Sequence, residues 1–315
     1  MLTLNQIEPR TPITNLPYNI NASGSYYVTT NLTCTACSNG VNGITVSTFG
    51  AMGLTPVDNV TIDLSGFTLF GANGSASGIY ALGGHNYVVR NGTLRNWGAD
   101  GVNALSSVNN RIENLQLYAN ANLGLAAGVG SVVVNCEAYS NTVAGFQLAG
   151  GEISHCVAFY NTGIGILASN GCVVGDCTAQ GNGSDGIDCA VGTTVRNCSS
   201  YQNRGNGVTT VSGCTIIGCT ASGNSSFGIV GNNCTIKDCT VSGNLYGIFV
   251  GAYSTVKDCT ATTNVDAGIL ISVNGCLIAG NTCGGNDLGI WIDGVQIALM
   301  ATQSTTTLMA SLQAL

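Results

Sequence analysis

Hydrophobic and polar residues alternate over short runs along most of this chain, and the runs recur at a spacing of about 21 residues. The segment 170–190 returns with changed details at 212–231 and again at 232–251. Alternation with a period of two predicts β-strands, because successive side chains of a strand point to opposite faces. A repeat of this length predicts one supersecondary unit stacked on copies of itself. We therefore predict an all-β protein, a parallel β-solenoid of about eleven coils.

Three positions can be followed from coil to coil. Asparagine recurs at Asn120, Asn141, Asn161, Asn182, Asn203, Asn224, Asn244, Asn264 and Asn286. Glycine before an apolar residue recurs at Gly145, Gly165, Gly186, Gly207, Gly228, Gly247, Gly268 and Gly289, and cysteine at Cys136, Cys156, Cys177, Cys198, Cys219, Cys239 and Cys259. Asparagine and glycine suit corners, whereas buried cysteine behaves as a small hydrophobic residue. We expect an asparagine ladder and a cysteine ladder inside the solenoid.

The two ends of the chain depart from the period. Residues 1–58 contain all four prolines and only short β-like runs, whereas the repeat continues from 59 to 294. Since a stack of strands has exposed apolar ends, we predict an N-terminal cap at 1–58 and a C-terminal cap or tail at 295–315. Apolar residues in the tail suit either a short helix over the last coil or a contact that joins subunits, and the threonines at 305–307 oppose a continuous helix.

Charges are sparse, and the balance is acidic. Only 7% of the residues are charged, the net charge is −7, and the eight Lys and Arg residues are scattered. Without a basic stripe, a nucleic-acid partner is not expected. The N-terminal residues do not have the pattern of a signal peptide, and 297–315 is too polar for a bilayer segment. We expect no membrane span, and we favour an extracellular or cell-surface location.

The fifteen cysteines would suggest a disulfide scaffold in a short secreted chain, but most of them follow the repeat. Cysteines stacked in register have parallel Cβ vectors, which makes disulfides between coils geometrically marginal. We therefore interpret the ladder cysteines as reduced core residues. Cys34 and Cys37 form an isolated CxxC motif without further zinc ligands, so a local disulfide and two plain thiols are the interpretations.

The repeat resembles a known family. Units such as CTASGN at 219–224 and SDGI at 184–187, with the earlier segments 59–71 and 88–102, look like the right-handed parallel β-helix repeats of the pectin-lyase-like superfamily. They are most similar to uncharacterised bacterial β-helix repeat proteins, over about residues 15–294. The resemblance implies a right-handed, single-stranded β-helix. It implies little about activity, since the fold carries lyases, hydrolases, tailspikes, adhesins and structural proteins.

The acidic candidates for catalysis are Asp185, Asp188 and Glu137. Ser184 to Asp188 resembles the first acidic motif of polygalacturonase-type hydrolases, which cleave with paired carboxylates. No adjacent Asp pair follows one coil later, and Asp185 with Gly186 repeats a corner that reads Asp100 and Gly101 elsewhere. A structural corner is therefore the alternative, and a catalytic set is not complete.

A metal site is not expected, although Asp238 and Asp258 are candidate ligands beside the stacked Lys237 and Lys257. Two carboxylates from adjacent coils can hold a cation, but such a quartet more often forms a solvated, self-neutralising patch. No cofactor motif is present, and we expect no cofactor.

An outward column of aromatic and polar residues is the strongest functional feature of the sequence. Two residues before each ladder asparagine stand Tyr118, Tyr139, Phe159, Gln180 and Tyr201. Aromatic rings with neighbouring polar groups suit the apolar faces and hydroxyls of sugars. The alternative is that stacked rings stabilise the parallel strands. Further along, Thr220, Ser222, Thr240, Ser242, Thr260 and Thr262 form two short hydroxyl rows that resemble ice-binding arrays.

These features lead to one functional hypothesis with three alternatives. We predict a non-catalytic β-helix rod whose aromatic and polar side face binds polysaccharide or another surface. The alternatives are a polysaccharide lyase or glycoside hydrolase of the pectin-lyase-like type, a purely structural repeat protein and, behind these, an ice-binding protein.

Overall fold

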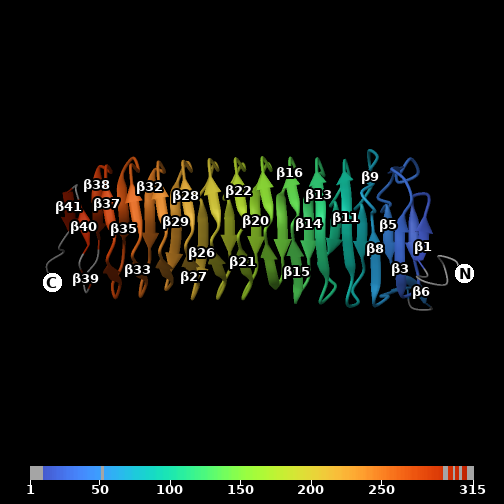
Figure 1. The fold of residues 1–315 in the computed structure, drawn as a ribbon, viewed down its shortest axis with the longest axis horizontal. Helices are drawn as coiled ribbons and strands as arrows, with labels where there is room; N and C mark the ends of the chain where they lie inside the picture. The colour runs from blue at the N-terminus through green and yellow to red at the C-terminus, as the bar shows by residue number, and fades with distance from the viewer. Residues whose placement is uncertain (1–9, 51–52, 294–296, 301, 305–306, 311–315) are drawn as a thin grey trace, which may run out of the picture. The chain divides into compact units, whose positions relative to one another are not determined.

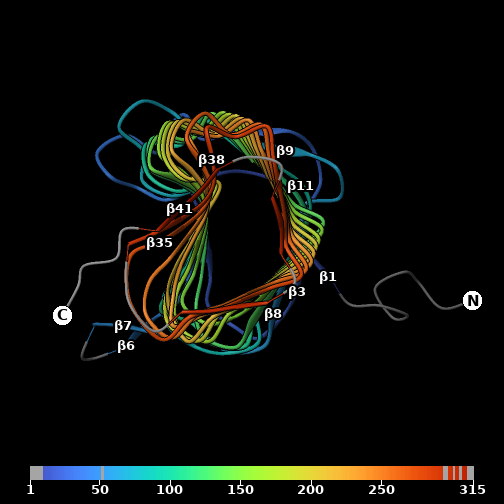
Figure 2. The same ribbon diagram turned by 90° about the vertical axis from the view of Figure 1, so that its left-hand side faces the viewer.

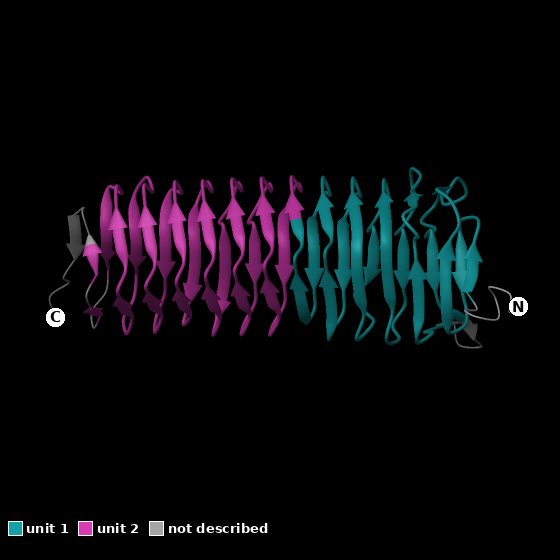
Figure 3. Cartoon of the chain, in the orientation of Figure 1, with its two compact units in different colours: residues 1–157 teal, residues 158–315 magenta. Residues whose placement is uncertain are grey.

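The structure is a computed structural model that describes residues 10–50, 53–293, 297–300, 302–304 and 307–310. Over these residues every regular element is a β-strand, and there is no helix of the length and apolarity that a membrane span requires. Contacts divide the chain into two compact units, Met1–Val157 and Ala158–Leu315 (Figure 3). Over the described residues the chain makes about eleven turns of a parallel β-solenoid, as the repeat predicts.

In the first unit, the strands form two parallel sheets and one hairpin (Figure 1). The first sheet holds β1 (Arg10–Ile13), β3 (Gly24–Val28), β4 (Leu32–Thr33), β8 (Val60–Asp63), β9 (Thr68–Phe70), β11 (Val88–Arg95), β13 (Arg111–Tyr118), β15 (Ser131–Val134), β16 (Glu137–Tyr139) and β18 (Gly151–Ser154). The second holds β2 (Tyr18–Ile20), β5 (Ile44–Val46), β10 (Ile79–Ala81), β12 (Val102–Ala104), β14 (Leu123–Ala127) and β17 (Ala144–Leu148). The antiparallel hairpin of β6 (Thr48–Gly50) and β7 (Gly53–Thr55) projects from the coils (Figure 2).

The second unit repeats this arrangement, and β19 (Val157–Phe159) contains the division between the units. Its first sheet holds β21 (Val173–Gly175), β22 (Thr178–Gln180), β24 (Thr194–Arg196), β25 (Ser199–Tyr201), β27 (Thr215–Ile217), β28 (Thr220–Ser222), β30 (Thr235–Lys237), β31 (Thr240–Ser242), β33 (Thr255–Lys257), β34 (Thr260–Thr262), β36 (Leu277–Ala279), β37 (Thr282–Gly284), β39 (Ala298–Met300) and β40 (Gln303–Ser304). Its second sheet holds β20 (Ile164–Ala168), β23 (Ile187–Cys189), β26 (Val208–Ser212), β29 (Phe227–Asn232), β32 (Tyr246–Val250), β35 (Ala267–Ile271), β38 (Leu288–Ile292) and β41 (Thr307–Ala310).

Each regular coil therefore contributes two short strands to the first sheet and one to the second. Left-handed residues make the corners between them, and the two columns at these corners differ in composition. One column is occupied by Asn135, His155, Asp176, Asn197, Gly218, Asp238, Asp258 and Gly280, and the other by Ala119, Ser140, Tyr160, Gly181, Gln202, Gly223, Gly243, Thr263 and Gly285. Glycine and short polar side chains adopt this conformation at low cost, which explains why they dominate the corners.

The asparagine ladder is confirmed. In the second unit, Asn182 donates from its backbone N–H and from its side-chain amide to Oδ1 of Asn203, at 2.9 and 3.0 Å. Asn203 repeats both bonds to Asn224 at 3.0 Å. In the first unit Asn120 makes the same pair of bonds to Asn141. The oxygen of each buried asparagine thus accepts hydrogen bonds from the corner of the preceding coil. Water cannot replace these bonds, because the groups are buried.

The cysteine ladder is also confirmed as part of the core. All the free cysteines of the described residues are buried, beside inward Ile, Val and Ala side chains. Burial raises the pKa of Cys283 to about 12. The Cys283 thiol is therefore a protonated packing group at neutral pH, since the thiolate is the reactive form.

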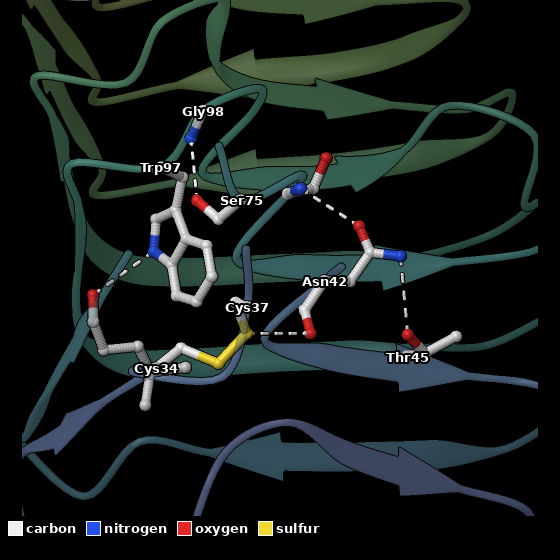
Figure 4. The surroundings of a disulfide bond; sticks show 9 residues. Cys34, Cys37, Asn42, Thr45, Ser75, Trp97 and Gly98 are labelled. Carbon is white, nitrogen blue, oxygen red and sulfur yellow. Dashed lines mark hydrogen bonds between the residues drawn. A yellow bond between two sulfur atoms is a disulfide. The ribbon is translucent and has the colours of Figure 1, made fainter. Parts of the chain in front are cut away.

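Of the two interpretations of the CxxC motif, the structure has the disulfide between Cys34 and Cys37, with Cα atoms 5.3 Å apart. The bond lies beside the buried Trp97, whose indole N–H donates to the Leu69 carbonyl at 3.3 Å (Figure 4). Sγ of Cys37 lies 3.3 Å from the carbonyl oxygen of Asn42. The disulfide thus closes a local turn against the first unit's largest core side chain, which is a structural role.

Both ends of the described chain continue the solenoid. Parallel pairing begins with β1, where Arg10 pairs with Ser25, and it passes from β3 to β8. At the other end, β39 pairs with β36 and β41 pairs with β38. The tail adds strands here instead of the short helix that was one of its two interpretations, because an edge of unpaired backbone groups favours another coil. The role of 1–58 as a cap stays a prediction.

Candidate functional site

The predicted aromatic column begins in the first unit with Tyr118 and Tyr139, which are register partners at the ends of β13 and β16. Both side chains are half-exposed, and their rings are stacked with centroids 4.6 Å apart and planes at 10°. Burial and the neighbouring Tyr118 raise the pKa of the Tyr139 hydroxyl. Because each ring covers the inner face of the other, a ligand cannot contact these inner faces. It meets the ring edges and the hydroxyl groups instead.

Arg95 stands in the same column, although the sequence reasoning missed it. It pairs with Phe70 on one side and with Tyr118 on the other. Its guanidinium carbon lies 4.5 Å from the Phe70 ring centroid and 5.4 Å from that of Tyr118, which are cation–π distances. The early coils have unequal lengths, so a fixed repeat does not bring these positions into one column. Arg95 could have been found by its place two residues before the corner at Trp97, just as Tyr118 stands two residues before Asn120.

The hydrogen-bonding capacity of Arg95 is largely unused. Its Nε is buried without a hydrogen-bond partner, and no carboxylate pairs with it among the described residues. Two other arginines of this unit do hold carboxylates: Arg90 lies 3.1 Å from Asp63, and Arg111 lies 2.7 Å from Glu113. A guanidinium carries five N–H donors and no acceptor, so Arg95 offers a cationic group to an external acceptor.

A polar row runs beside the column, two residues earlier in each strand. It consists of Thr68, Thr93, Gln116 and Glu137, which are successive register partners. Thr93 donates to Gln116 at 3.5 Å, and Gln116 donates to Glu137 at 3.4 Å. Glu137, one of the acidic candidates, is thus an exposed member of this row. We call the column of Phe70, Arg95, Tyr118 and Tyr139, together with this row, the Arg95 face.

The remaining members of the predicted column lie at 159–201. Gln180 and Tyr201 are register partners, and the Tyr201 hydroxyl donates to Oε1 of Gln180 at 2.6 Å. Phe159 makes an edge-to-face contact with Tyr160, with centroids 5.8 Å apart. All three side chains are half-exposed. In the second unit the column continues from Tyr201 to Ser222, so its aromatic part ends at Tyr201.

Asp185 is held by the next coil. Its carboxylate accepts hydrogen bonds from the backbone N–H of Asn206 at 2.8 Å and from the Thr209 hydroxyl at 2.6 Å. Asp100 of the first unit plays a similar part, accepting from Asn122 and from the backbone of Leu123. These contacts are those of the structural alternative, in which a corner carboxylate ties one coil to the next.

Asp188 has a different environment from Asp185. It is half-exposed in the middle of β23, and its register partners are Leu167 and Thr209. Burial, and after it the charge of Asp185, raise the pKa of Asp188. A carboxyl group with a raised pKa suits proton donation better than an ordinary aspartate does. Asp185 and Asp188 therefore come together, whereas Glu137 lies on the first sheet of the other unit.

The candidate metal ligands are engaged with their neighbouring lysines. Lys237 and Lys257 are register partners, and each contacts the aspartate that follows it, at 3.2 Å for Asp238 and 3.7 Å for Asp258. All four groups are at least partly exposed. This is the geometry of the predicted self-neutralising patch. Within the described residues, no group of three or more His, Cys, Asp and Glu side chains is placed to hold a metal.

A second aromatic feature, on the second sheet of the second unit, also escaped the sequence reasoning. Its outward column passes from Leu167 through Asp188 and Thr209 and then turns apolar and half-exposed, through Val230, Phe249, Leu270 and Trp291. Next to it, Phe227 and Tyr246 stack with centroids 4.9 Å apart. The sequence pattern that could have revealed this column is the residue that directly follows each glycine–apolar pair. Such a column can pack against an apolar ligand surface.

Comparisons with known proteins agree with this architecture. A family model described as the right handed beta helix region matches residues 42–194 and 186–288. The A-module of the Azotobacter vinelandii mannuronan C-5 epimerase AlgE4 is similar in structure, with a TM-score of 0.56, 13% identity and coverage of 93% of this chain and 91% of that chain. The periplasmic alginate epimerase AlgG has a TM-score of 0.58 and 12% identity, over 91% of this chain and 76% of that chain.

The identities with these epimerase structures are low enough that the likeness concerns the fold alone. No curated protein matches the sequence. The assignment of an activity to the chain therefore has to come from its own residues.

Proposed function

Because this chain belongs to the right-handed β-helix family, we propose that it is a non-catalytic β-helix that binds polysaccharide through the Arg95 face of its first unit. The two similar structures are named as epimerases of mannuronan and of alginate, which makes a polysaccharide the ligand class to test first. The long in-register rows of a solenoid suit a polymer, since successive coils present the same kind of side chain about every 4.8 Å.

The single observation that carries the proposal is the state of Arg95. The cation lies within cation–π distance of both Phe70 and Tyr118, and it has no carboxylate partner among the described residues. Holding a guanidinium by two rings lowers the entropy cost of engaging it, and its planar fork matches a carboxylate in a bidentate way. An acidic polysaccharide supplies such carboxylates along its length.

The rest of the Arg95 face supports contact with sugar hydroxyls. Gln116 and Glu137 are exposed beside the column, and the Tyr118 and Tyr139 pair presents ring edges and phenolic groups. These are donors and acceptors of the kind that bind sugars. The stacked geometry shifts the expected contact from the inner ring faces to the Arg95 guanidinium and the ring edges. Phe159, Gln180 and Tyr201, the remaining members of the predicted column, are not needed for this binding mode.

A polysaccharide lyase or glycoside hydrolase is the second candidate, and the raised pKa of Asp188 is the observation in its favour. It requires a partner carboxylate that is free to act as base or nucleophile. Asp185 is near enough for its charge to act on Asp188, but its carboxylate accepts hydrogen bonds from Asn206 and Thr209. The non-catalytic proposal therefore accounts for more of the structure.

Affinity electrophoresis of the full chain in gels that contain alginate, polygalacturonate or a neutral glucan tests the proposal. We expect retardation in the acidic gels, and a loss of about tenfold or more in affinity for Arg95→Gln, because hydrogen bonds to charged groups contribute about 1.5–3 kcal/mol. Arg111→Gln, which removes an exposed arginine that already has a partner, is the matched control.

Unchanged retardation of Arg95→Gln would refute the role of the Arg95 face. Release of unsaturated or reducing products from the same polysaccharides, with loss of that activity in Asp188→Asn, would replace the proposal with the enzyme alternative.

A further inference from the structure

The second unit has a notch at one corner, where a coil places glycines on both sides of its ladder asparagine. Gly181 and Gly183 flank the buried Asn182, whereas the preceding coil has Tyr160 and Thr162 at the equivalent positions. The following coil has Arg204 after its ladder asparagine. A pocket of about 280 Å³ results, lined by Tyr160, Asn161, Thr162, Gly181, Gly183 and Arg204. We call it the Tyr160–Arg204 notch.

The backbone pairing sets the spacing of the notch walls. The N–H of Gly183 donates to Asn161 at 2.8 Å, and the N–H of Arg204 donates to Asn182 at 2.9 Å, so the three coils follow one another directly. Tyr160 and Arg204 therefore stand two strand spacings apart, which is roughly 10 Å between backbones. The pocket volume of about 280 Å³ is the space that remains beside these side chains.

Tyr160 is held in an unfavourable backbone conformation. Its φ is 52°, in the left-handed region where bulky side chains are rare, and the next coil has Gly181 at this corner. The Tyr160 ring lies over Gly181, since a Cβ on that glycine would come within 2.7 Å of ring atom Cδ1. The residue is nevertheless 60% exposed. The corner thus displays an aromatic ring where glycine would cost less, and much of that ring is open.

Arg204 supplies a cation that has no partner among the residues that the structure describes. It is exposed, and no ion pair or side-chain hydrogen bond engages it among the described residues. The other basic residues of this unit contact aspartates: Arg196 lies 3.5 Å from Asp176, and Lys237 and Lys257 contact the carboxylates beside them. In a chain with a net charge of −7, this free guanidinium is available to an external anion.

We propose that the Tyr160–Arg204 notch binds a single carboxylated sugar residue, a hexuronate, with its apolar ring face on Tyr160 and its carboxylate on the Arg204 guanidinium. An aromatic ring and a guanidinium that line one pocket recognise the apolar face and the carboxylate of such a residue. The volume is near the lower limit of ligand pockets, which suits one ring and not a polymer segment. The site lies on a corner of the second unit and does not involve Arg95, so it goes beyond the proposed function.

Titration calorimetry of the full chain with D-glucuronate and with D-glucose tests the notch, because the two probes share a ring and differ in the carboxylate. We expect glucuronate to bind about tenfold or more tightly than glucose, and Arg204→Gln to remove this difference. Lys237→Gln makes the same change of charge at a paired, exposed lysine and should leave glucuronate binding unchanged.

The variant Tyr160→Gly removes the aromatic ring without disturbing the fold, so a loss of binding in this variant does not come from unfolding. Glycine suits the left-handed corner, so this variant should unfold no more readily than the parent chain while its affinity for glucuronate falls by about tenfold. Arg95→Gln should bind glucuronate normally, which separates failure of the notch from failure of the polysaccharide proposal.

Three results would overturn the inference. The first is equal binding of glucose and glucuronate, and the second is glucuronate binding that survives both Arg204→Gln and Tyr160→Gly. The third is competition by inorganic phosphate at equal concentration together with an unaffected Tyr160→Gly variant, which would reduce the notch to a general anion contact.

Discussion

Replacing Asn203 with alanine tests whether the asparagine ladder stabilises the second unit. The side chain is 1% exposed. Its Oδ1 accepts from the backbone N–H and from the side-chain amide of Asn182, at 2.9 and 3.0 Å, and its own amide donates to Asn224 and to the Ala179 carbonyl. Alanine provides none of these groups, so the corner of the preceding coil loses its acceptor.

The size of the effect follows from the groups left without partners. Two donors of Asn182, the backbone N–H and one amide hydrogen, lose the oxygen to which they were bonded. An unsatisfied buried donor costs about 1–3 kcal/mol, so we expect Asn203→Ala to lower the free energy of unfolding by about 2–6 kcal/mol. A typical domain has about 5–15 kcal/mol of stability, so this loss is large.

Urea unfolding with hydrogen exchange read out by peptide is the appropriate assay, because a stack of repeats does not always unfold in one step. Exchange should accelerate most in peptides that contain Asn182 and Asn203. Asn232→Ala is the control, since Asn232 is exposed at the end of β29 and its replacement should change stability by less than about 0.5 kcal/mol. A loss below about 1 kcal/mol for Asn203→Ala, or equal effects of the two variants, would refute the reasoning.

Two further predictions concern a corner glycine and a carboxyl group of the same unit. Gly186→Ala should lower the free energy of unfolding by about 1–3 kcal/mol, because the added Cβ would clash with Ser200. In the control variant Gly192→Ala the Cβ meets no atom within 4 Å, so only the left-handed strain of about 1 kcal/mol is expected. A lower urea midpoint for Gly192→Ala than for Gly186→Ala would contradict this prediction. The raised pKa of Asp188 means that the folded chain holds this proton more tightly than the unfolded chain, so its contribution to stability declines as pH rises from 3.8 through the raised pKa. Asp188→Asn should remove that decline, and parallel melting temperatures of the two proteins from acid to neutral pH would show the prediction to be wrong.

Much of the fold was predictable because a coil pairs with a copy of itself. Positions such as Asn203 and Cys198 recur along the sequence, and parallel pairing in register turns each recurrence into a column in space. Inward and outward sides followed from the two-residue alternation. The prediction weakened where the coils are irregular, which is why Arg95 did not appear in the column of Tyr118.

The order of residues along the chain is enough to predict the repeat, and with it the strands, the ladders and the side of the sheet on which a residue lies. The tertiary structure decided what depends on side-chain conformation and on neighbours from other coils. It covers the inner ring faces of Tyr118 and Tyr139, leaves Arg95 without a carboxylate among the described residues, and places Tyr160 over Gly181 in a pocket that Arg204 also lines. Periodicity assigns a residue to a column, but ring planes, ion pairs and notches result from packing between particular side chains of adjacent coils.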